Sequence, residues 1–250
     1  YLQVNRQICS QTSNNMVIGS GLVARAFSAY KTDDRFLIFA SGVSDSTNTN
    51  VSAFNRERAL LIRNLQEHKE KIFVYFSTCS IYDATLSKTP YVLHKAEMEK
   101  IVIRENAHHY IFRISNLVGR SVNPHTVLNF FIQHIVSGTF FYLWKGASRN
   151  IIDIKDAFSI CHYILQEDLS FNKIINIASP ISHDVMDIVN EIETFFGKKG
   201  NYEIVEKPGQ SVIDTSDIQK IITVLNINFN KDYLGKVINK YFGANDVSAG

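Results

Sequence analysis

Three residues of this chain have the types and spacing needed for proton transfer: Thr78 in the segment FVYFSTCSIYD, and Tyr91 and Lys95 in YVLHK. A tyrosine and a lysine four positions apart lie on the same face of a helix, about one turn from each other. A phenol normally titrates near pKa ~10, and an ammonium one turn away favours the phenolate and lowers that pKa. A hydroxyl at a nearby strand end would hold the oxygen of an alcohol or ketone. The set predicts alcohol–carbonyl interconversion, which requires a hydride carrier.

The tyrosine–lysine pair is weak evidence when taken alone. With 11 tyrosines in the chain, about one Tyr-x-x-x-Lys match is expected by chance. The alternative is an amphipathic helix over YVLHKAEMEKIVIRENA, with a half-buried tyrosine and a solvated lysine. The elements around the pair must decide between the two interpretations.

The composition is that of a globular protein with one α/β domain, or a domain with a small appended lobe. Of the 250 residues, 45% are apolar and 20% charged, and the net charge of +2 is too small to predict a nucleic-acid or membrane partner. Cys9, Cys79 and Cys161 have no paired spacing, and the eight histidines have no metal-ligand spacing. Neither a disulfide framework nor a metal site is therefore predicted.

The cysteine usage fits a reducing cytoplasm, which is the location we expect. No apolar run reaches the ~18 residues that predict a transmembrane helix. Residues 1–14 are polar and lack the apolar core of a signal peptide. We expect them to form an extension before the domain.

The segment MVIGSGLVARAFSAY predicts a short strand, a glycine turn and a helix. Gly19, Gly21 and Ala24 match the dinucleotide-binding fingerprint in its alanine-ended form. In that pattern Gly19 makes the tight turn, Gly21 lets a pyrophosphate approach the backbone, and Ala24 keeps the helix close to the strand. The predicted cofactor contacts in this segment are Gly19, Ser20, Gly21, Leu22 and Val23.

The later elements alternate in type, which predicts a parallel, doubly wound α/β sheet of Rossmann type. Strands are expected at RFLIFAS, IFVYFS and YIFRIS, with helices over FNRERALLIRNLQEHKEK and the Tyr91 segment. From about Pro124 the pattern is mostly helical, with a late strand at FNKIINIAS and helices over DVMDIVNEIETFFGKK, 214–224 and 231–242. We assign residues 15–123 to a dinucleotide-binding part, and 124–245 to a mixed part that completes the sheet and forms a small, mostly helical substrate lobe.

Ordered landmarks from about Asn15 to Phe242 resemble the extended short-chain dehydrogenase/reductase family, in its nucleotide-sugar epimerase, dehydratase and reductase branch. FSTCSIYD resembles the segment that carries the catalytic hydroxyl, which falls on Thr78, four before Tyr82. YVLHK resembles the catalytic Tyr-x-x-x-Lys. The other landmarks are FASGVSDS with Ala40 and Ser41, FNRERALLIRNL with Asn55, FRISNLVG with Arg113, Asn116 and Gly119, and RNIIDIKDAF with Arg149 and Asp156.

The resemblance implies NAD or NADP as cofactor and a nucleotide-linked sugar as substrate. It adds Ala40, Ser41, Asn55, Tyr91 and Lys95 to the cofactor contacts. The implied substrate contacts are Thr78, Asn116, His125, Thr126 and Arg149. It also implies a homodimer through helices at 52–68 and 91–106, whereas the alternative is that their apolar stripes pack only on the sheet.

The chain departs from the family pattern at two places. Only 19 residues separate Gly21 from Ala40, so the family's second and third strands are missing, together with the acidic residue that binds the adenosine ribose. The choice between NAD and NADP therefore stays open. The dehydratases carry Asp-Glu after the catalytic threonine, but this chain has Cys79 and Ser80, which argues against dehydration and makes Cys79 a small packing residue.

These observations predict NAD(P)-dependent reduction of a keto group on a nucleotide-linked sugar. A reductase releases its cofactor at each turnover and tolerates a smaller adenosine site than an epimerase that keeps its cofactor bound. The alternatives are an NAD-dependent nucleotide-sugar epimerase and, in another class, a non-catalytic protein that binds a dinucleotide or nucleotide sugar.

Overall fold

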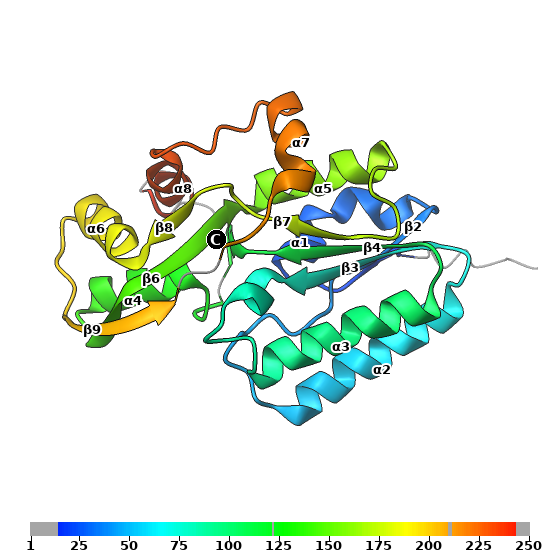
Figure 1. The fold of residues 1–250 in the computed structure, drawn as a ribbon, viewed down its shortest axis with the longest axis horizontal. Coiled ribbons are helices and arrows are strands. Elements are labelled where there is room, and N and C mark those ends of the chain that lie inside the picture. Colours follow the sequence, from blue (N-terminus) through cyan, green and yellow to red (C-terminus); the bar gives the residue numbers. More distant parts are fainter. Residues whose placement is uncertain (1–14, 122, 210–211, 244–250) are drawn as a thin grey trace, which may run out of the picture.

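The computed structural model describes residues 15–121, 123–209 and 212–243. Its main sheet contains five strands, and every neighbouring pair in it is parallel. In order across the sheet, they are β1 (Val17–Ile18), β2 (Phe36–Phe39), β3 (Ile72–Thr78), β4 (His109–Ile114) and β7 (Ile174–Ile177) (Figure 1). The predicted Rossmann-like α/β fold is confirmed. Among the described residues β1 forms one edge of this sheet, as expected if the two strands that normally lie beyond it are missing.

Helices cover both faces of the main sheet. One face packs against α2 (Val51–Glu67) and α3 (Pro90–Glu105), which lie below the sheet in Figure 1. The other packs against α1 (Leu22–Ala26) and α5 (Ile154–Gln166), followed at its margin by α7 (Gln219–Val224). Three 3₁₀ segments complete this part of the chain: η1 (Ser28–Thr32), η2 (Cys79–Tyr82) and η3 (Ser216–Ile218).

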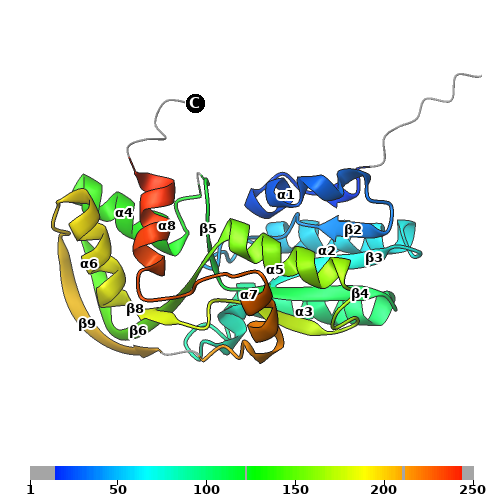
Figure 2. The same cartoon turned by 90° about the horizontal axis from the view of Figure 1, so that it is seen from above.

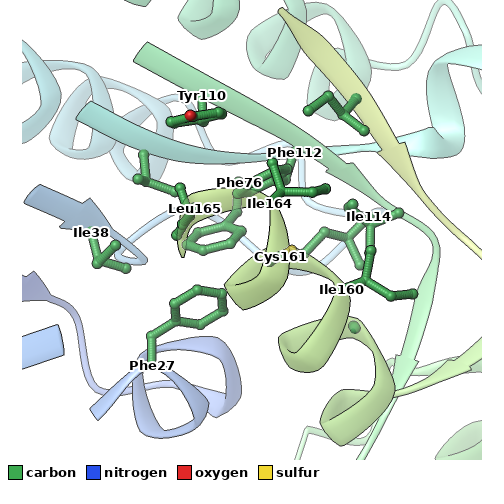
Figure 3. Close-up of a cluster of buried hydrophobic side chains, with 14 of the residues drawn as sticks. Phe27, Ile38, Phe76, Tyr110, Phe112, Ile114, Ile160, Cys161, Ile164 and Leu165 are labelled. Atoms are coloured by element: carbon green, nitrogen blue, oxygen red, sulfur yellow. The ribbon is translucent and has the colours of Figure 1, made fainter. Parts of the chain in front are cut away.

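Alternation along the strands explains why the sheet has two apolar faces. Ile38, Phe76 and Phe112 point toward α1 and α5, where they join Phe27 and Cys161 in one buried cluster (Figure 3). The residues next to them in the strands face the other way. Leu37, Tyr75 and Ile111 belong to the cluster under α2 and α3. Strands buried on both faces read as continuous apolar runs, as RFLIFAS and IFVYFS do.

The first crossover has the opposite hand to the next two. The strands from β1 to β4 follow one another across the sheet, so each connection steps in the same direction. Because α1 lies on the face opposite to α2 and α3, its crossover must have the other hand. Right-handed crossovers are the rule in about 98% of parallel connections. The exception follows from the shortened chain: in a full doubly wound sheet this helix leads to a strand beyond β1, whereas here it returns to β2.

The remaining elements form a second lobe that is less helical than expected. It has a four-stranded sheet built on the long β6 (Phe141–Asp153). The other strands are β5 (Asn116–Val118), β8 (Ser182–Asp184) and β9 (Tyr202–Gly209), and the helices are α4 (Val127–Ser137), α6 (Val185–Phe196) and α8 (Tyr233–Phe242) (Figure 2). Side chains of GTFFYLWKG alternate between the lobe core and the surface, so Phe141 and Leu143 pack in the core whereas Phe140 and Tyr142 are exposed.

None of the helices in the described part of the chain is long and apolar enough to cross a membrane.

Candidate active site

The structure brings Thr78, Tyr91 and Lys95 to one region at the carboxyl end of β3. Thr78 ends this strand, and its hydroxyl accepts a hydrogen bond from the Ser80 backbone N–H (3.1 Å), which fixes the turn into η2. Thr89 caps α3, with Pro90 in its first turn, so Tyr91 and Lys95 follow on successive turns. All three predicted catalytic side chains are buried, and the Thr78 hydroxyl, which donates to Ser80 Oγ (3.0 Å), is near enough to the Tyr91 phenol to affect its pKa.

Lys95 is only 4% exposed, so the interpretation of a solvated lysine is wrong. Its Nζ donates to Glu57 Oε1 (3.1 Å), to the Tyr75 hydroxyl (3.1 Å) and to the Phe76 carbonyl (3.2 Å). Tyr75 also donates to Glu57 Oε1 (2.9 Å). Lys95 is thus held in a buried set of polar side chains, which we call the Glu57 cluster: Glu57, Tyr75, His94 and Lys95.

Glu57 is the functional candidate that the sequence patterns did not reveal. Its second oxygen accepts from the Val43 N–H (2.7 Å) and lies 3.0 Å from His94 Nε2. Burial opposes ionisation, but the charge of Lys95 and the hydrogen bonds from His94 and Val43 lower the pKa of Glu57 to about 2. The one signal in the sequence was its position one turn before Leu61, where a carboxylate interrupts the buried stripe of α2.

The Tyr91 phenol keeps its proton at neutral pH. Burial raises its pKa to about 12, the nearby Thr78 hydroxyl opposes this rise, and the charges of Glu57 and Asp45 add to it. The expectation that Lys95 lowers this pKa is wrong for this structure, because Glu57 carries a compensating charge beside Lys95. A phenol that stays neutral can donate a proton and is poorly suited to accept one.

The glycine turn has the geometry that a pyrophosphate requires. Gly19 has φ +129°, and a Cβ there would lie 2.4 Å from the Ala40 carbonyl oxygen and 3.1 Å from the Ser41 nitrogen. The turn, Ala40 and Ser41 are thus brought together, as predicted. Gly21 precedes α1 with no atom near its missing Cβ, and no side chain caps this helix. The open backbone N–H groups fit a cofactor pyrophosphate.

The adenosine half of a cofactor has no matching site at the usual place. β1 ends the sheet, so within the described residues no further strand offers an acidic residue to a ribose. Asp33 is bonded to Arg35 instead (3.0 Å). The described residues therefore fit the pyrophosphate of a dinucleotide at the glycine turn, and they offer its adenosine ribose no acidic contact beyond β1. Val23 packs on the core under α1, and Leu22 lies against the position of Gly119.

Asn55 does not join the other predicted cofactor contacts. It is exposed and lines an outer groove of about 270 Å³ between α2 and the start of α3. The polar residue of α2 that does reach Lys95 is Glu57, two positions later. The Nδ2 of Asn116, a predicted substrate contact, donates to the Asn150 carbonyl (2.8 Å), and this structural bond links β5 to β6.

Apart from Thr78, the predicted substrate residues belong to the second lobe. His125 Nε2 is 4.0 Å from Asp45 Oδ2, in the loop after β2, and Asp45 is the same carboxylate that acts on Tyr91. Thr126 precedes α4 and makes no side-chain cap bond. Arg149 Nη1 donates to the Ser148 carbonyl (2.9 Å).

Arg149 is half-buried at the junction between the lobes. Its Nη1 lies 3.8 Å from Asp83 Oδ2, and its guanidinium lies over the Trp144 ring at 5.8 Å. Burial lowers the pKa of Arg149, and the charge of Asp83 opposes this change. Asp83 directly follows η2, so this pair connects the substrate lobe to the Thr78 segment.

The residues after Thr78 have structural roles. The Cys79 thiol donates to the Arg113 carbonyl (3.1 Å), and burial raises its pKa to about 12, as expected for a packing residue. The Arg113 guanidinium binds both oxygens of Glu99 (2.9 and 2.6 Å) and the Tyr82 hydroxyl (2.8 Å). These contacts of Arg113 with Glu99 and Tyr82 hold η2 in place. The described residues include no group of three or more side chains placed to bind a metal.

Comparison with known families agrees with this geometry. Residues 19–178 match the sequence model of the NAD dependent epimerase/dehydratase family. The match covers more than half of the chain, which therefore belongs to this family of NAD-dependent enzymes. Comparison with curated proteins gives no significant match.

Several solved structures share the fold of this chain at low sequence identity. The dTDP-glucose 4,6-dehydratase of Bacillus anthracis, in complex with NAD, is 16% identical over 87% of this chain and 76% of its own, with a TM-score of 0.65. The UDP-glucose 4-epimerase of Thermus thermophilus with NAD is 17% identical over 89% and 81%, also with a TM-score of 0.65. RMD from Pseudomonas aeruginosa, complexed with NADPH, is 12% identical over 83% and 81%, with a TM-score of 0.62.

Proposed function

We propose that this protein reduces a keto group on a nucleotide-linked sugar with NAD(P)H. The observation that carries the proposal is the buried Tyr91 phenol beside Thr78, because burial raises the pKa of this phenol to about 12. Reduction of a ketone forms an alkoxide, which is a stronger base than a phenolate and takes a proton from a neutral phenol. A protonated Tyr91 is ready for this direction of the reaction.

The chain's own residues would position and protonate the substrate oxygen. The cofactor supplies the hydride that reaches the carbonyl carbon. Thr78 holds the carbonyl oxygen beside Tyr91, which gives its proton to that oxygen as the negative charge develops. Glu57 and Tyr75 hold Lys95 behind the site. The Glu57 carboxylate compensates the charge of Lys95, so only the uncompensated part of that charge acts on the substrate oxygen.

The substrate class is supported by the family and by the similar structures. Those structures are named for acting on dTDP-glucose or UDP-glucose, or contain NAD or NADPH. Arg149 is the chain's candidate for a diphosphate contact, because it is a partly desolvated guanidinium at the lobe junction. Asn116, His125 and Thr126 are the candidate sugar contacts.

An NAD-dependent epimerase is the alternative within the same class. Such an enzyme first oxidises an alcohol and needs a base to take the hydroxyl proton. A phenol with a pKa near 12 is poorly suited to that role at neutral pH. The direction of the shift therefore favours reduction.

A non-catalytic binding protein is the second candidate function, and one observation favours it. The ion pair between Lys95 and Glu57 occupies the lysine that otherwise activates the tyrosine. A protein that only binds a nucleotide sugar has no need of an activated phenol.

The test follows cofactor turnover with a panel of substrates. Purified protein would be mixed with NADH or NADPH and 4-keto sugars linked to UDP, GDP or dTDP, and separately with NAD(P)⁺ and the parent sugars. The proposal expects cofactor oxidation with at least one keto sugar and its loss in Tyr91→Phe. Interconversion of parent sugars without net cofactor consumption would identify an epimerase. Binding without turnover in either direction would identify the non-catalytic protein.

A further inference from the structure

A second cavity, of about 480 Å³, lies between α1, α5 and α8. It is on the face of the main sheet opposite to α2 and α3, and Figure 2 shows α1 and α8 on either side of the segment that follows β5. It adjoins the glycine turn, because Leu22 and Arg25 form one wall and Arg25 Nη1 donates to the Ser20 carbonyl (3.2 Å). None of the described residues that line it belongs to the Glu57 cluster.

The charge of this cavity is positive. Four basic side chains line it and, among the described residues, no acidic one does: Arg25, Arg120, Lys155 and Lys240. The hydrogen bonds of the Arg25 guanidinium go to the Ser20 and Arg120 carbonyls, and within the described part of the chain no carboxylate pairs with it. Lys240 is paired with Asp153, whereas Lys155 is exposed at the start of α5. An anion entering the cavity would meet an excess of positive charge.

Aromatic rings supply the apolar part of the lining. Phe158 belongs to α5, where its ring also packs edge-on against Phe27 (5.0 Å). Tyr241 belongs to α8, and its hydroxyl is held by Asp153 Oδ1 (2.7 Å). The volume lies in the range of about 300–1,000 Å³ that is usual for small-molecule sites. Rings beside clustered cations suit a ligand that joins a planar base to a phosphate.

We propose that this cavity binds a nucleoside phosphomonoester, with the phosphate near Arg25 and Lys155 and the base against the aromatic rings. Two sources carry this chemistry: the 2′-phosphoadenosine end of NADP(H), and a free mononucleotide. The position next to the glycine turn favours the first, because the pyrophosphate site at Gly21 and this cavity share α1. In that form the proposal rests on the proposed function, and it gives NADPH an adenosine site that the shortened sheet does not provide.

The test measures nucleotide binding by calorimetry to the whole 250-residue chain and to a charge-reversed variant. The ligands are adenosine 2′,5′-bisphosphate, 5′-AMP, NADPH and NADH. Lys155→Glu replaces attraction by repulsion at an exposed position and is expected to weaken binding of the bisphosphate by about tenfold. The matched control is Lys69→Glu, an exposed lysine at the end of α2 on the other face of the sheet, which should bind as the wild type does.

The ligand series separates the two sources. Tighter binding of NADPH than NADH, and of the bisphosphate than 5′-AMP, with both differences lost in Lys155→Glu, supports the cofactor end. Binding of 5′-AMP that weakens in Lys155→Glu, with equal affinities for NADPH and NADH, supports a free mononucleotide. If Lys155→Glu binds every ligand as the wild type does, or no ligand binds the wild type, the proposal is overturned. Weakened binding in Lys155→Glu without any turnover would leave the cavity assigned and the reductase function rejected.

Discussion

Tyr91 and Lys95 lie one turn apart on α3, yet they contact different partners. Tyr91 lies near Thr78 at the end of β3, whereas Lys95 is bound by Glu57, Tyr75 and the Phe76 carbonyl. In water an ammonium beside a phenol lowers the pKa of the phenol. Here burial and the nearby carboxylates decide the outcome in the opposite direction, and the phenol stays protonated.

The first prediction concerns the Tyr91 hydroxyl. Tyr91→Phe removes the proton donor without emptying the buried space of the ring, so turnover should fall by about 10²–10⁴-fold while cofactor affinity stays within about twofold. Steady-state rates and calorimetric binding measure the two effects. Tyr142→Phe, which removes an exposed hydroxyl on β6, is the matched control and should change neither. Equal rates in Tyr91→Phe and wild type would show that another group gives the proton.

The second prediction concerns the buried ion pair. Glu57→Gln leaves the Lys95 charge without a carboxylate, which is expected to lower the free energy of unfolding by about 3 kcal/mol in urea denaturation at neutral pH. The control is Glu97→Gln, whose exposed pair with Arg58 (2.8 Å) should contribute less than about 1 kcal/mol. Equal losses of stability in Glu57→Gln and Glu97→Gln would contradict the assignment of Glu57 and Lys95 as a stabilising buried ion pair.

The lowered pKa of Glu57 predicts how the stability of the protein depends on pH. The pKa of Glu57 is lowered from 4.5 to about 2 on folding, so its contribution is fully present above the unfolded value. It is lost as the pH falls from about 4.5 toward about 2, because the folded state must then be protonated against Lys95. Unfolding measured across this range should show a steeper loss of stability in wild type than in Glu57→Gln. Parallel curves would indicate that other carboxylates control acid unfolding.

At the scale of elements, the two glycines before α1 have separate tasks. Gly19→Ala meets the Ala40 carbonyl at 2.4 Å in a left-handed backbone conformation, so we expect a loss of about 1–3 kcal/mol in stability. Gly21→Ala meets no atom within 4 Å and should unfold as wild type does, yet its Cβ would project toward the pyrophosphate and weaken NAD(P)H binding. Thermal unfolding and calorimetry on both variants distinguish the two roles. If Gly21→Ala lost stability and Gly19→Ala lost only cofactor binding, the cofactor would have to bind elsewhere.

Local patterns predicted the elements that have strong local signals. The alternation of RFLIFAS, IFVYFS and YIFRIS with helices was enough to predict the parallel sheet, and 231–242 was expected to be helical and contains α8. The start of α2 was placed late, because the sequence did not reveal that Asn50 caps it by accepting from the Ser52 and Ala53 N–H groups. β6 was missed, since Gly146 and polar residues interrupt its apolar pattern.

The candidate site was predictable only in part, for a physical reason. Thr78, Tyr91 and Lys95 were recognisable from spacing within short segments. The pairing of Glu57 with Lys95 joins residues 38 positions apart on two helices, and no local pattern specifies it. This pairing depends on how α2 and α3 pack on the sheet. The direction of the shift in the pKa of Tyr91 depends on the same packing.

At the scale of the whole molecule, the two lobes are joined through α5 and α8. Asp153 caps α5 through the Lys155 N–H (2.8 Å), accepts from Tyr241 (2.7 Å) and pairs with Lys240. Tyr233 adds a hydrogen bond from its hydroxyl to Asp156 (2.6 Å). The last helix is thereby fixed to the helix that covers the main sheet.

This junction gives a prediction for the stability of the molecule. Asp153→Ala removes the cap and the buried acceptor of two side chains of α8, and should lower the free energy of unfolding by about 3 kcal/mol in urea. The C-terminal helix should also become sensitive to limited proteolysis. Asp217→Ala, an exposed carboxylate in η3, is the control and should change stability by less than about 0.5 kcal/mol. An unchanged proteolytic pattern in Asp153→Ala would show that α8 is held by its apolar contacts alone.

The central claim is that Tyr91 acts as a neutral acid in reduction, and the pH dependence of the reductive rate tests it most directly. The rate of NAD(P)H oxidation with a saturating 4-keto nucleotide sugar would be followed from about pH 6 to about pH 10. We expect a rate that stays level over this range, because a phenol with a pKa of about 12 keeps its proton throughout. A rate that rises with pH would contradict it, since the active form would then be the phenolate.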